Sequence, residues 1–114
     1  MAKLSRTDRL RKQELRLSQS LTIKNKYFLA LFKPNQQKHA RLGIIVSKQF
    51  VRRAVDRNLL KRVVRESFRY HKEDLKELDI VVIIRSECST FGAKIWRNDI
   101  DNLWQKLIAS LKIA

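Results

Sequence analysis

Apolar residues recur every three or four positions in two segments of the chain, and this spacing predicts amphipathic helices over residues 53–71 and 92–112. Placed at about 100° per residue, the apolar side chains of the first segment fall on one broad arc. They are Val55, Leu59, Leu60, Val63, Val64 and Phe68. The corresponding positions of the second segment are Trp96, Ile100, Leu103, Trp104, Leu107, Ile108 and Leu111. We expect the first set, including Leu59, and the two tryptophans of the second set to lie in the core.

Shorter apolar segments have the pattern of β-strands. Residues 79–85 are almost entirely β-branched, which predicts a strand covered on both faces. The remaining strands are expected within residues 20–47, with a turn after Pro34, because proline cannot donate a ladder hydrogen bond. The strand that begins at Arg41 contains Gly43, which indicates a bulge or a close backbone approach.

The first 19 residues form a basic N-terminal segment. A short helix is predicted over residues 9–17. It has few apolar residues, so it should pack against the surface of the domain rather than form its core. The chain has 114 residues, two glycines, one proline and no internal repeat. We therefore expect a single domain over residues 1–114.

The charge is concentrated in the first two thirds of the chain. The formal net charge is +15, and residues 1–40 carry ten basic and two acidic side chains, as do residues 41–72. Residues 73–114 carry six basic and seven acidic side chains, so they are close to neutral. A fixed cationic surface attracts polyanions, which makes nucleic acid the expected partner.

The sequence also argues against several classes of protein. No apolar run approaches the roughly 18 residues of a membrane span, and the start of the chain lacks the apolar stretch of a secretory signal. The single Cys88 is typical of a reducing cytoplasm. One cysteine and two separated histidines are also too few for a structural zinc site, which needs about four ligands.

The predicted helix over residues 53–71 has one cationic face. Opposite its apolar arc lie Asn58, Lys61, Arg62, Arg65 and Arg69. Around this face lie Arg57, at the border of the arc, and Lys48, Arg52 and Arg53, ahead of the helix. A solvated helix surface would carry acidic partners one turn away, but only Asp56 and Glu66 are acidic between residues 48 and 69. The face therefore predicts contacts to phosphate, which the arginine fork pairs with bidentately.

The linear order of these residues is specific. A glycine-containing strand ends in Ser47-Lys48, and the following helix carries Arg57-Asn58 and then Lys61-Arg-Val-Val-Arg-Glu-Ser-Phe-Arg69. This order resembles the bacterial ribonuclease P protein family, whose helix opens with Arg-Asn-Arg and continues Lys-Arg-x-x-Arg-Glu-x-x-Arg. The match covers residues 41–85. It departs at Leu59, where the family has its second arginine, and in the first helix, which lacks the usual phenylalanines.

The resemblance implies an α+β two-layer sandwich with the order αβββαβα, a four-stranded mixed sheet and a left-handed βαβ crossover. It further implies that the protein assists an endonuclease, ribonuclease P, without catalytic residues of its own. A catalytic RNA, with Mg²⁺ held mainly by RNA and substrate, removes the 5′ leader of precursor tRNA. The implied partners are that RNA and precursor tRNA in the cytoplasm, with no membrane and no obligate protein partner.

The resemblance also assigns roles to residues of this sequence. The expected contacts to the catalytic RNA are Lys48, Arg52, Arg53, Arg57, Asn58, Lys61, Arg62, Arg65 and Arg69. A groove for the single-stranded leader would be lined from the segment that holds Tyr27, Phe28 and Phe32, because aromatic rings stack on bases. The other interpretation of these three rings is that they belong to the core.

Two other functions stay open. A protein-only nuclease would need clustered carboxylates to hold Mg²⁺. We interpret the one dense acidic group as solvated or capping residues, and both histidines as surface residues: Glu73, Asp74, Glu77 and Asp79, with His39 and His71. A non-enzymatic RNA-binding module, similar to a ribosomal protein, would share the charge and differ only in the order of the motifs.

Overall fold

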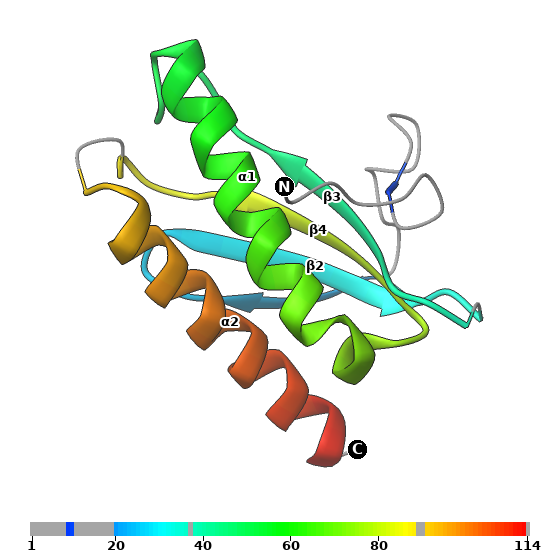
Figure 1. Cartoon of the computed structure of the whole chain (residues 1–114). Helices are drawn as coiled ribbons and strands as arrows, with labels where there is room; N and C mark the ends of the chain where they lie inside the picture. Colours follow the sequence, from blue (N-terminus) through cyan, green and yellow to red (C-terminus); the bar gives the residue numbers. More distant parts are fainter. Residues whose placement is uncertain (1–8, 11–19, 37, 89–90, 114) are drawn as a thin grey trace.

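The computed structural model describes residues 9–10, 20–36, 38–88 and 91–113, and the described elements follow the order βββαβα with one additional 3-10 turn. The strands are β1 (Leu21–Lys24), β2 (Phe28–Pro34), β3 (Arg41–Ile45) and β4 (Leu78–Ile84). The helices are α1 (Ala54–His71), η3 (Lys72–Leu75) and α2 (Ala93–Ile113). Figure 1 shows two layers, with α1 and α2 on the same face of the sheet. The predicted α+β sandwich is therefore confirmed, and α1, β4 and α2 each begin and end within one residue of their predicted bounds.

The four strands form one mixed sheet in the order β1-β2-β4-β3. β1, β2 and β4 are antiparallel neighbours, and β3 runs parallel to β4. The β3–β4 register is continuous from Arg41 opposite Asp79 to Ile45 opposite Ile83, so Gly43 sits in a regular ladder opposite Val81 and marks no bulge.

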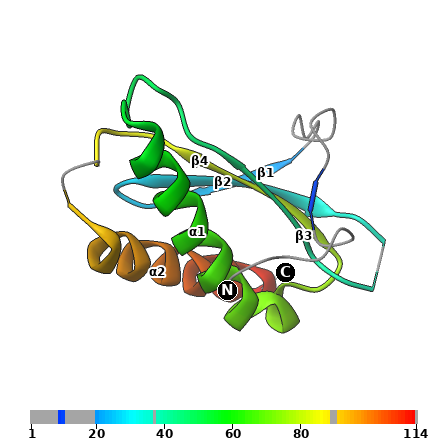
Figure 2. The ribbon, with the colours of Figure 1, turned by 45° about the horizontal axis from the view of Figure 1, so that its top comes forward.

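The unit formed by β3, α1 and β4 has an uncommon hand. Figure 1 views the sheet from the helix side, and along the common direction of the two strands β4 lies to the left of β3 while α1 passes in front. In Figure 2, turned by 45°, both helices lie below the sheet, which agrees with their position in front of it in the first view. The crossover is therefore left-handed, whereas roughly 98% of such connections are right-handed.

The core lies between the sheet and the two long helices. Alternation along β2 points Phe28, Ala30 and Phe32 toward the helices, where all three are buried. The ring of Phe68 on α1 meets Trp104 on α2 edge-on, with 5.9 Å between centroids. Trp96 and Trp104 are fully buried, as predicted. Each large apolar side chain buried in this way stabilises the fold by about 1.5–3 kcal/mol.

A short polar chain crosses this core between the helices. Trp104 Nε1 donates to Ser67 Oγ over 2.8 Å, and the Ser67 hydroxyl donates to Asp101 Oδ1 on α2. Trp96 Nε1 donates to the carbonyl oxygen of Cys88 over 2.8 Å. Because buried polar groups destabilise a core unless they are hydrogen-bonded, the bonds through Ser67 fix how α1 and α2 face each other, and the Trp96 bond ties α2 to the loop before it.

Two positions of the predicted apolar arc on α1 are not in the core. Val55 is 59% exposed and Leu59 40% exposed, so the prediction that both are buried is wrong. The buried residues of α1 are Leu60, Val63, Val64, Ser67 and Phe68. They occupy a narrower arc, because the sheet and α2 together cover only one side of the helix. Val55 and Leu59 lie beyond the edge of that arc, near the start of α1.

Two residues of the N-terminal segment are described, and they line the outer edge of the sheet. Arg9 forms a parallel bridge with Leu42 of β3, and the Leu10 amide donates to the Leu42 carbonyl over 3.0 Å. The predicted helix over residues 9–17 therefore does not begin at Arg9. Residues 11–17 of that prediction lie outside the described residues.

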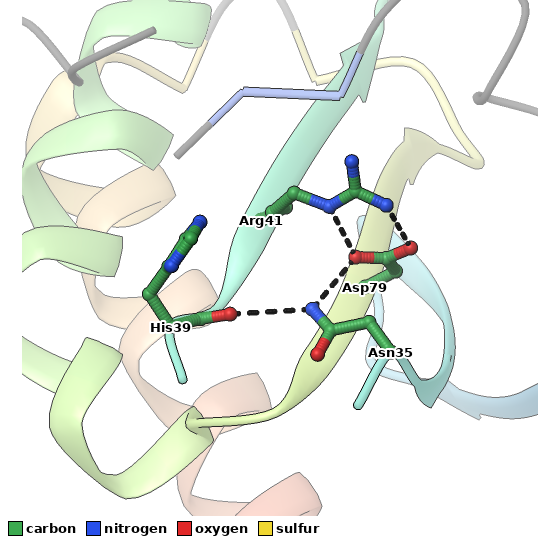
Figure 3. Close-up of polar contacts among 4 residues, drawn as sticks. All are labelled: Asn35, His39, Arg41 and Asp79. Carbon is green, nitrogen blue, oxygen red and sulfur yellow. Dashed lines mark hydrogen bonds and ion pairs between the residues drawn. The ribbon is translucent and has the colours of Figure 1, made fainter. Parts of the chain in front are cut away.

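A buried ion pair joins β3 to β4 at the start of both strands (Figure 3). Arg41 contacts the Asp79 carboxylate with two nitrogens, Nε to Oδ1 at 2.8 Å and Nη2 to Oδ2 at 2.7 Å. Asn35 Nδ2 donates to Asp79 Oδ1 over 2.9 Å and to the His39 carbonyl over 3.2 Å. The interpretation of Asp79 as a solvated or capping residue is therefore wrong, since it is buried and paired. The cluster ties the turn after β2 to the parallel pair.

The environment of Asp79 favours its charged form. Burial alone would raise the pKa of this carboxyl, but hydrogen bonds from Arg41 and Asn35, and the charges of Arg41 and Lys33, outweigh burial and leave the pKa below its usual value. A depressed folded-state pKa contributes stability above the usual pKa of an aspartate, and this contribution disappears as the pH falls through the folded pKa.

We predict that Asp79→Asn lowers the free energy of unfolding at pH 7 by ~2 kcal/mol, because Arg41 is left without its counter-charge. Chemical denaturation at pH 7 and at pH values from about 5 downward measures this, and the variant should lose less stability on acidification than the unsubstituted chain. Asp74→Asn, the same change at an exposed position, is the control. Equal pH dependence of Asp79→Asn and the unsubstituted chain would contradict the prediction.

Candidate nucleic-acid interface

The polar residues opposite the buried arc of α1 lie on one outward side of the helix. We call Asn58, Lys61, Arg62, Arg65 and Arg69 the α1 cationic face. Asn58, Arg62 and Arg69 are exposed, and Lys61 and Arg65 are half-buried where the face meets the core. The spacing of three and four residues that made this face visible in the sequence therefore produces a continuous cationic surface on a helix of 18 residues.

The segment before α1 extends this surface. Lys48 and Arg52 are exposed in the loop after β3, and Arg53 is the exposed N-cap residue of α1. Positive side chains here add to the partial positive charge of the helix N-terminus, which favours anions. The predicted residues Lys48, Arg52 and Arg53 are thus exposed at or just before the N-terminal end of the helix that carries the α1 cationic face.

The Arg57 side chain is hydrogen-bonded to the loop before α1. Its Nη1 donates to the carbonyl oxygens of Val51, over 3.0 Å, and Arg52, over 2.6 Å. The side chain therefore holds the loop against the first turns of α1. Its contact with RNA stays a prediction.

Arg9 is a cation of this surface that sequence reasoning missed. Burial and, after it, the positive charge of Arg9 lower the pKa of Arg65, so the two guanidinium charges act on each other. Arg9 reaches this position because it bridges to Leu42 at the edge of the sheet beside α1. The high density of basic residues in the N-terminal segment was a signal, but nothing in the sequence indicates which of them lies beside α1.

The three rings predicted to line a leader groove are buried. Phe28 and Phe32 point between the sheet and the helices, and Tyr27 packs against Phe91 with 5.1 Å between ring centroids. The prediction that these rings offer stacking surfaces is therefore wrong, because the helices cover the face of β2 on which the phenylalanines lie. The alternative interpretation, that they belong to the core, holds.

The opposite face of the sheet carries different side chains. Alternation and register put there Thr22, Lys24, Leu29, Leu31, Lys33, Ile45, Val81 and Ile83, among others. Thr22, Lys24 and Ile45 are exposed, Val81 is fully buried, and the other four are half-buried. We call this surface the open face, because neither long helix covers it (Figure 2).

The acidic and histidine side chains of the described residues do not gather into one group. Within the described ranges no group of three or more His, Cys, Asp or Glu side chains could hold a metal ion. Glu73, Asp74 and Glu77 are exposed. His71, at the end of α1, places its Nδ1 2.9 Å from the Ser67 carbonyl oxygen. Of the helices in the described part of the chain, none is both long and apolar enough to cross a membrane.

Cys88 is buried, and its thiol is protonated at neutral pH. Burial, followed by the negative charges of Glu87 and Asp99, raises the pKa of Cys88 to about 11, against a smaller lowering by the Trp96 indole. Reactive cysteines have the opposite environment, with exposed sulfur and nearby positive charge. The residue therefore fills the core beside Trp96.

We predict that Cys88 reacts with an aromatic disulfide reagent at pH 8 at least 100-fold more slowly in the folded chain than in denaturant. At pH 8 a thiol with this raised pKa is thiolate in only about one molecule in a thousand. The absorbance of the released thiolate measures the rate, and a simple peptide thiol serves as the control. Equal rates in buffer and in denaturant would show that the thiol is neither buried nor perturbed.

Comparison with known proteins gives one consistent result. A family model described as Ribonuclease P matches residues 4–108. The ribonuclease P protein component of Acinetobacter baylyi is 44% identical over 81 residues, which are 71% of this chain and 62% of that relative, so the match spans less than two thirds of the relative's length.

Two solved structures are similar over nearly their whole length. The RNase P protein of Staphylococcus aureus has a TM-score of 0.77 at 30% identity, and the match covers 88% of this chain and 94% of that one. The RNase P protein of Thermotoga maritima has a TM-score of 0.66 at 38% identity, with coverages of 93% and 96%.

Proposed function

Since the chain belongs to the ribonuclease P protein family, we propose that it is the protein subunit of a ribonuclease P. In this proposal it binds a catalytic RNA and the 5′ leader of precursor tRNA, and it assists the Mg²⁺-dependent removal of the leader in the cytoplasm. The observation that carries the proposal is the α1 cationic face, which presents Arg62 and Arg69 on a rigid helix whose other side is fixed in the core.

The α1 cationic face would act by electrostatics and geometry together. Each lysine or arginine that neutralises a phosphate releases a counterion, so affinity falls as salt rises, with a log–log slope of about −0.9 per contact on duplex. Because Leu60, Val64 and Phe68 hold α1 in the core, the helix that carries these cations need not rearrange on binding. The positive charges of Arg65 and Arg9 repel each other, and a phosphate bound between them would reduce this repulsion.

The chemistry is assigned to the RNA. Mg²⁺ bound to RNA and substrate would supply the activated water for hydrolysis of the phosphodiester. Among the described residues the acidic side chains do not form a metal-binding group, and the buried Asp79 is paired with Arg41. The protein's own residues bind and orient RNA in this proposal.

The leader is assigned to the open face of the sheet. Both long helices cover the other face, so a strand of RNA that reaches the sheet meets the open face. Lys24 on β1 and Lys33 on β2 supply positive charge there, and the half-buried Leu29 and Leu31 lie between them. This surface replaces the buried rings Phe28 and Phe32 of the sequence-based prediction.

The test of the proposed function is a cleavage assay. The purified chain is mixed with a bacterial ribonuclease P RNA and a precursor tRNA at low Mg²⁺, where the RNA alone is slow. We expect faster release of the 5′ leader with the chain, and no cleavage by the chain alone. Absence of acceleration would favour the non-enzymatic RNA-binding module, and cleavage without the RNA would favour a protein nuclease.

We predict that Arg62→Ala weakens binding to the catalytic RNA about five- to tenfold and makes the salt slope shallower by about one contact, 0.7–0.9 units. The side chain is exposed, so the fold should be unchanged. Filter binding over a series of salt concentrations measures both quantities. Lys94→Ala removes one positive charge from an exposed position on α2 and is the matched control. Equal affinities of the two variants would remove Arg62 from the interface.

A further inference from the structure

An exposed aromatic ring lies where the second half of α1 faces α2. Tyr70 is 79% exposed, the most exposed of the large hydrophobic side chains described. The guanidinium carbon of Arg97, on α2, lies 5.2 Å from the centroid of its ring. A cation at this distance is attracted to the face of an aromatic ring. One face of the ring is therefore covered by Arg97, and the high exposure of Tyr70 leaves the other face to solvent.

Arg97 is held in place from inside the core. Its Nε donates to Asp101 Oδ1 over 3.1 Å, and Asp101 also accepts the hydrogen bond from Ser67. Ser67 in turn accepts from the buried indole of Trp104. Because this chain of bonds begins in the packed interior, the position of the guanidinium is set before any ligand arrives. Within the described residues Arg97 uses only Nε in hydrogen bonds, so its terminal nitrogens can still donate.

A cavity of about 420 Å³ lies beside this pair, lined by Glu66, Arg69, Tyr70 and Arg97. This volume is within the range of small-molecule sites. Two arginines and one aromatic ring are the groups that bind a nucleotide, the ring by stacking on the base and the guanidinium groups by pairing with phosphate. Glu66 is the one carboxylate among the lining residues, and Asp101 is paired with Arg97 through Nε, so a phosphate would pair with the terminal nitrogens of Arg97.

We propose that Tyr70 and Arg97 form a platform that binds one unstacked nucleotide of single-stranded RNA. The base stacks on the free face of Tyr70, and its phosphate pairs with Arg97. Arg69 lines the cavity and also belongs to the α1 cationic face, so an RNA bound on that face continues directly onto the platform. The inference deepens the proposed function, since it assumes that RNA binds the α1 cationic face, and it adds a contact with a base.

The test uses the full chain and a short fluorescent oligoadenylate, with affinity measured by anisotropy. Tyr70→Leu removes the ring and should weaken binding about tenfold, the loss expected for one stacked base. Tyr70→Phe keeps the ring and should bind within twofold of the unsubstituted chain. Arg97→Met should weaken binding more than Lys94→Met, which removes the same charge from α2 outside the cavity. Thermal melting checks that each variant is folded.

An affinity of Tyr70→Leu within twofold of the unsubstituted chain, or equal losses in Arg97→Met and Lys94→Met, would overturn the platform. Its failure is distinguishable from that of the proposed function. Weaker binding of the catalytic RNA by Arg62→Ala, together with unchanged oligoadenylate binding by Tyr70→Leu, would keep the proposed function and reject the platform. Unchanged binding of the catalytic RNA by Arg62→Ala, together with weaker oligoadenylate binding by Tyr70→Leu, would reject docking through the α1 cationic face and keep a nucleotide site at Tyr70.

Discussion

The structure depends on the burial of one face of a four-stranded sheet under two helices. Phe28 from the sheet, Phe68 from α1 and the two tryptophans of α2 fill the space between the layers. A chain with a net charge of +15 repels itself, and this apolar contact must offset that repulsion. The buried face of α1 is therefore fixed, and the cations of that helix are left exposed or half-buried outside the core.

Polar contacts then specify how the layers and strands meet. The hydrogen bonds from Trp104 to Ser67 and from Ser67 to Asp101 fix which sides of α1 and α2 face each other. The ion pair between Arg41 and Asp79 joins the two parallel strands. The left-handed crossover brings α1 back over the sheet on the side where Arg9 bridges to β3. The basic surface thus combines a helix with a segment more than forty residues away in the sequence.

Three surfaces follow from this arrangement, and each suits a different part of an RNA. The α1 cationic face offers phosphate contacts, the open face offers lysines beside half-buried leucines, and the Tyr70–Arg97 pair offers an aromatic ring. Their exposed side chains lie outside the core and can change with little effect on packing. Leu59 is an example, because it is 40% exposed where the family has an arginine and so alters the surface rather than the packing.

The sequence by itself determined the positions of α1, β4 and α2 along the chain, the separation of α1 into an apolar and a cationic side, and the family. Periodicity and motif order are properties of residues that are near each other in the sequence. Tertiary structure alone decided how much of α1 and which face of β2 are covered. A helical wheel gives the direction of Val55 and Leu59 but not how wide an arc the neighbours cover, and strand alternation pairs Phe28 with Phe32 but does not say which face meets the helices. The contacts of Arg9 with β3 and of Arg97 with Tyr70 join distant parts of the chain, so no local pattern could reveal them.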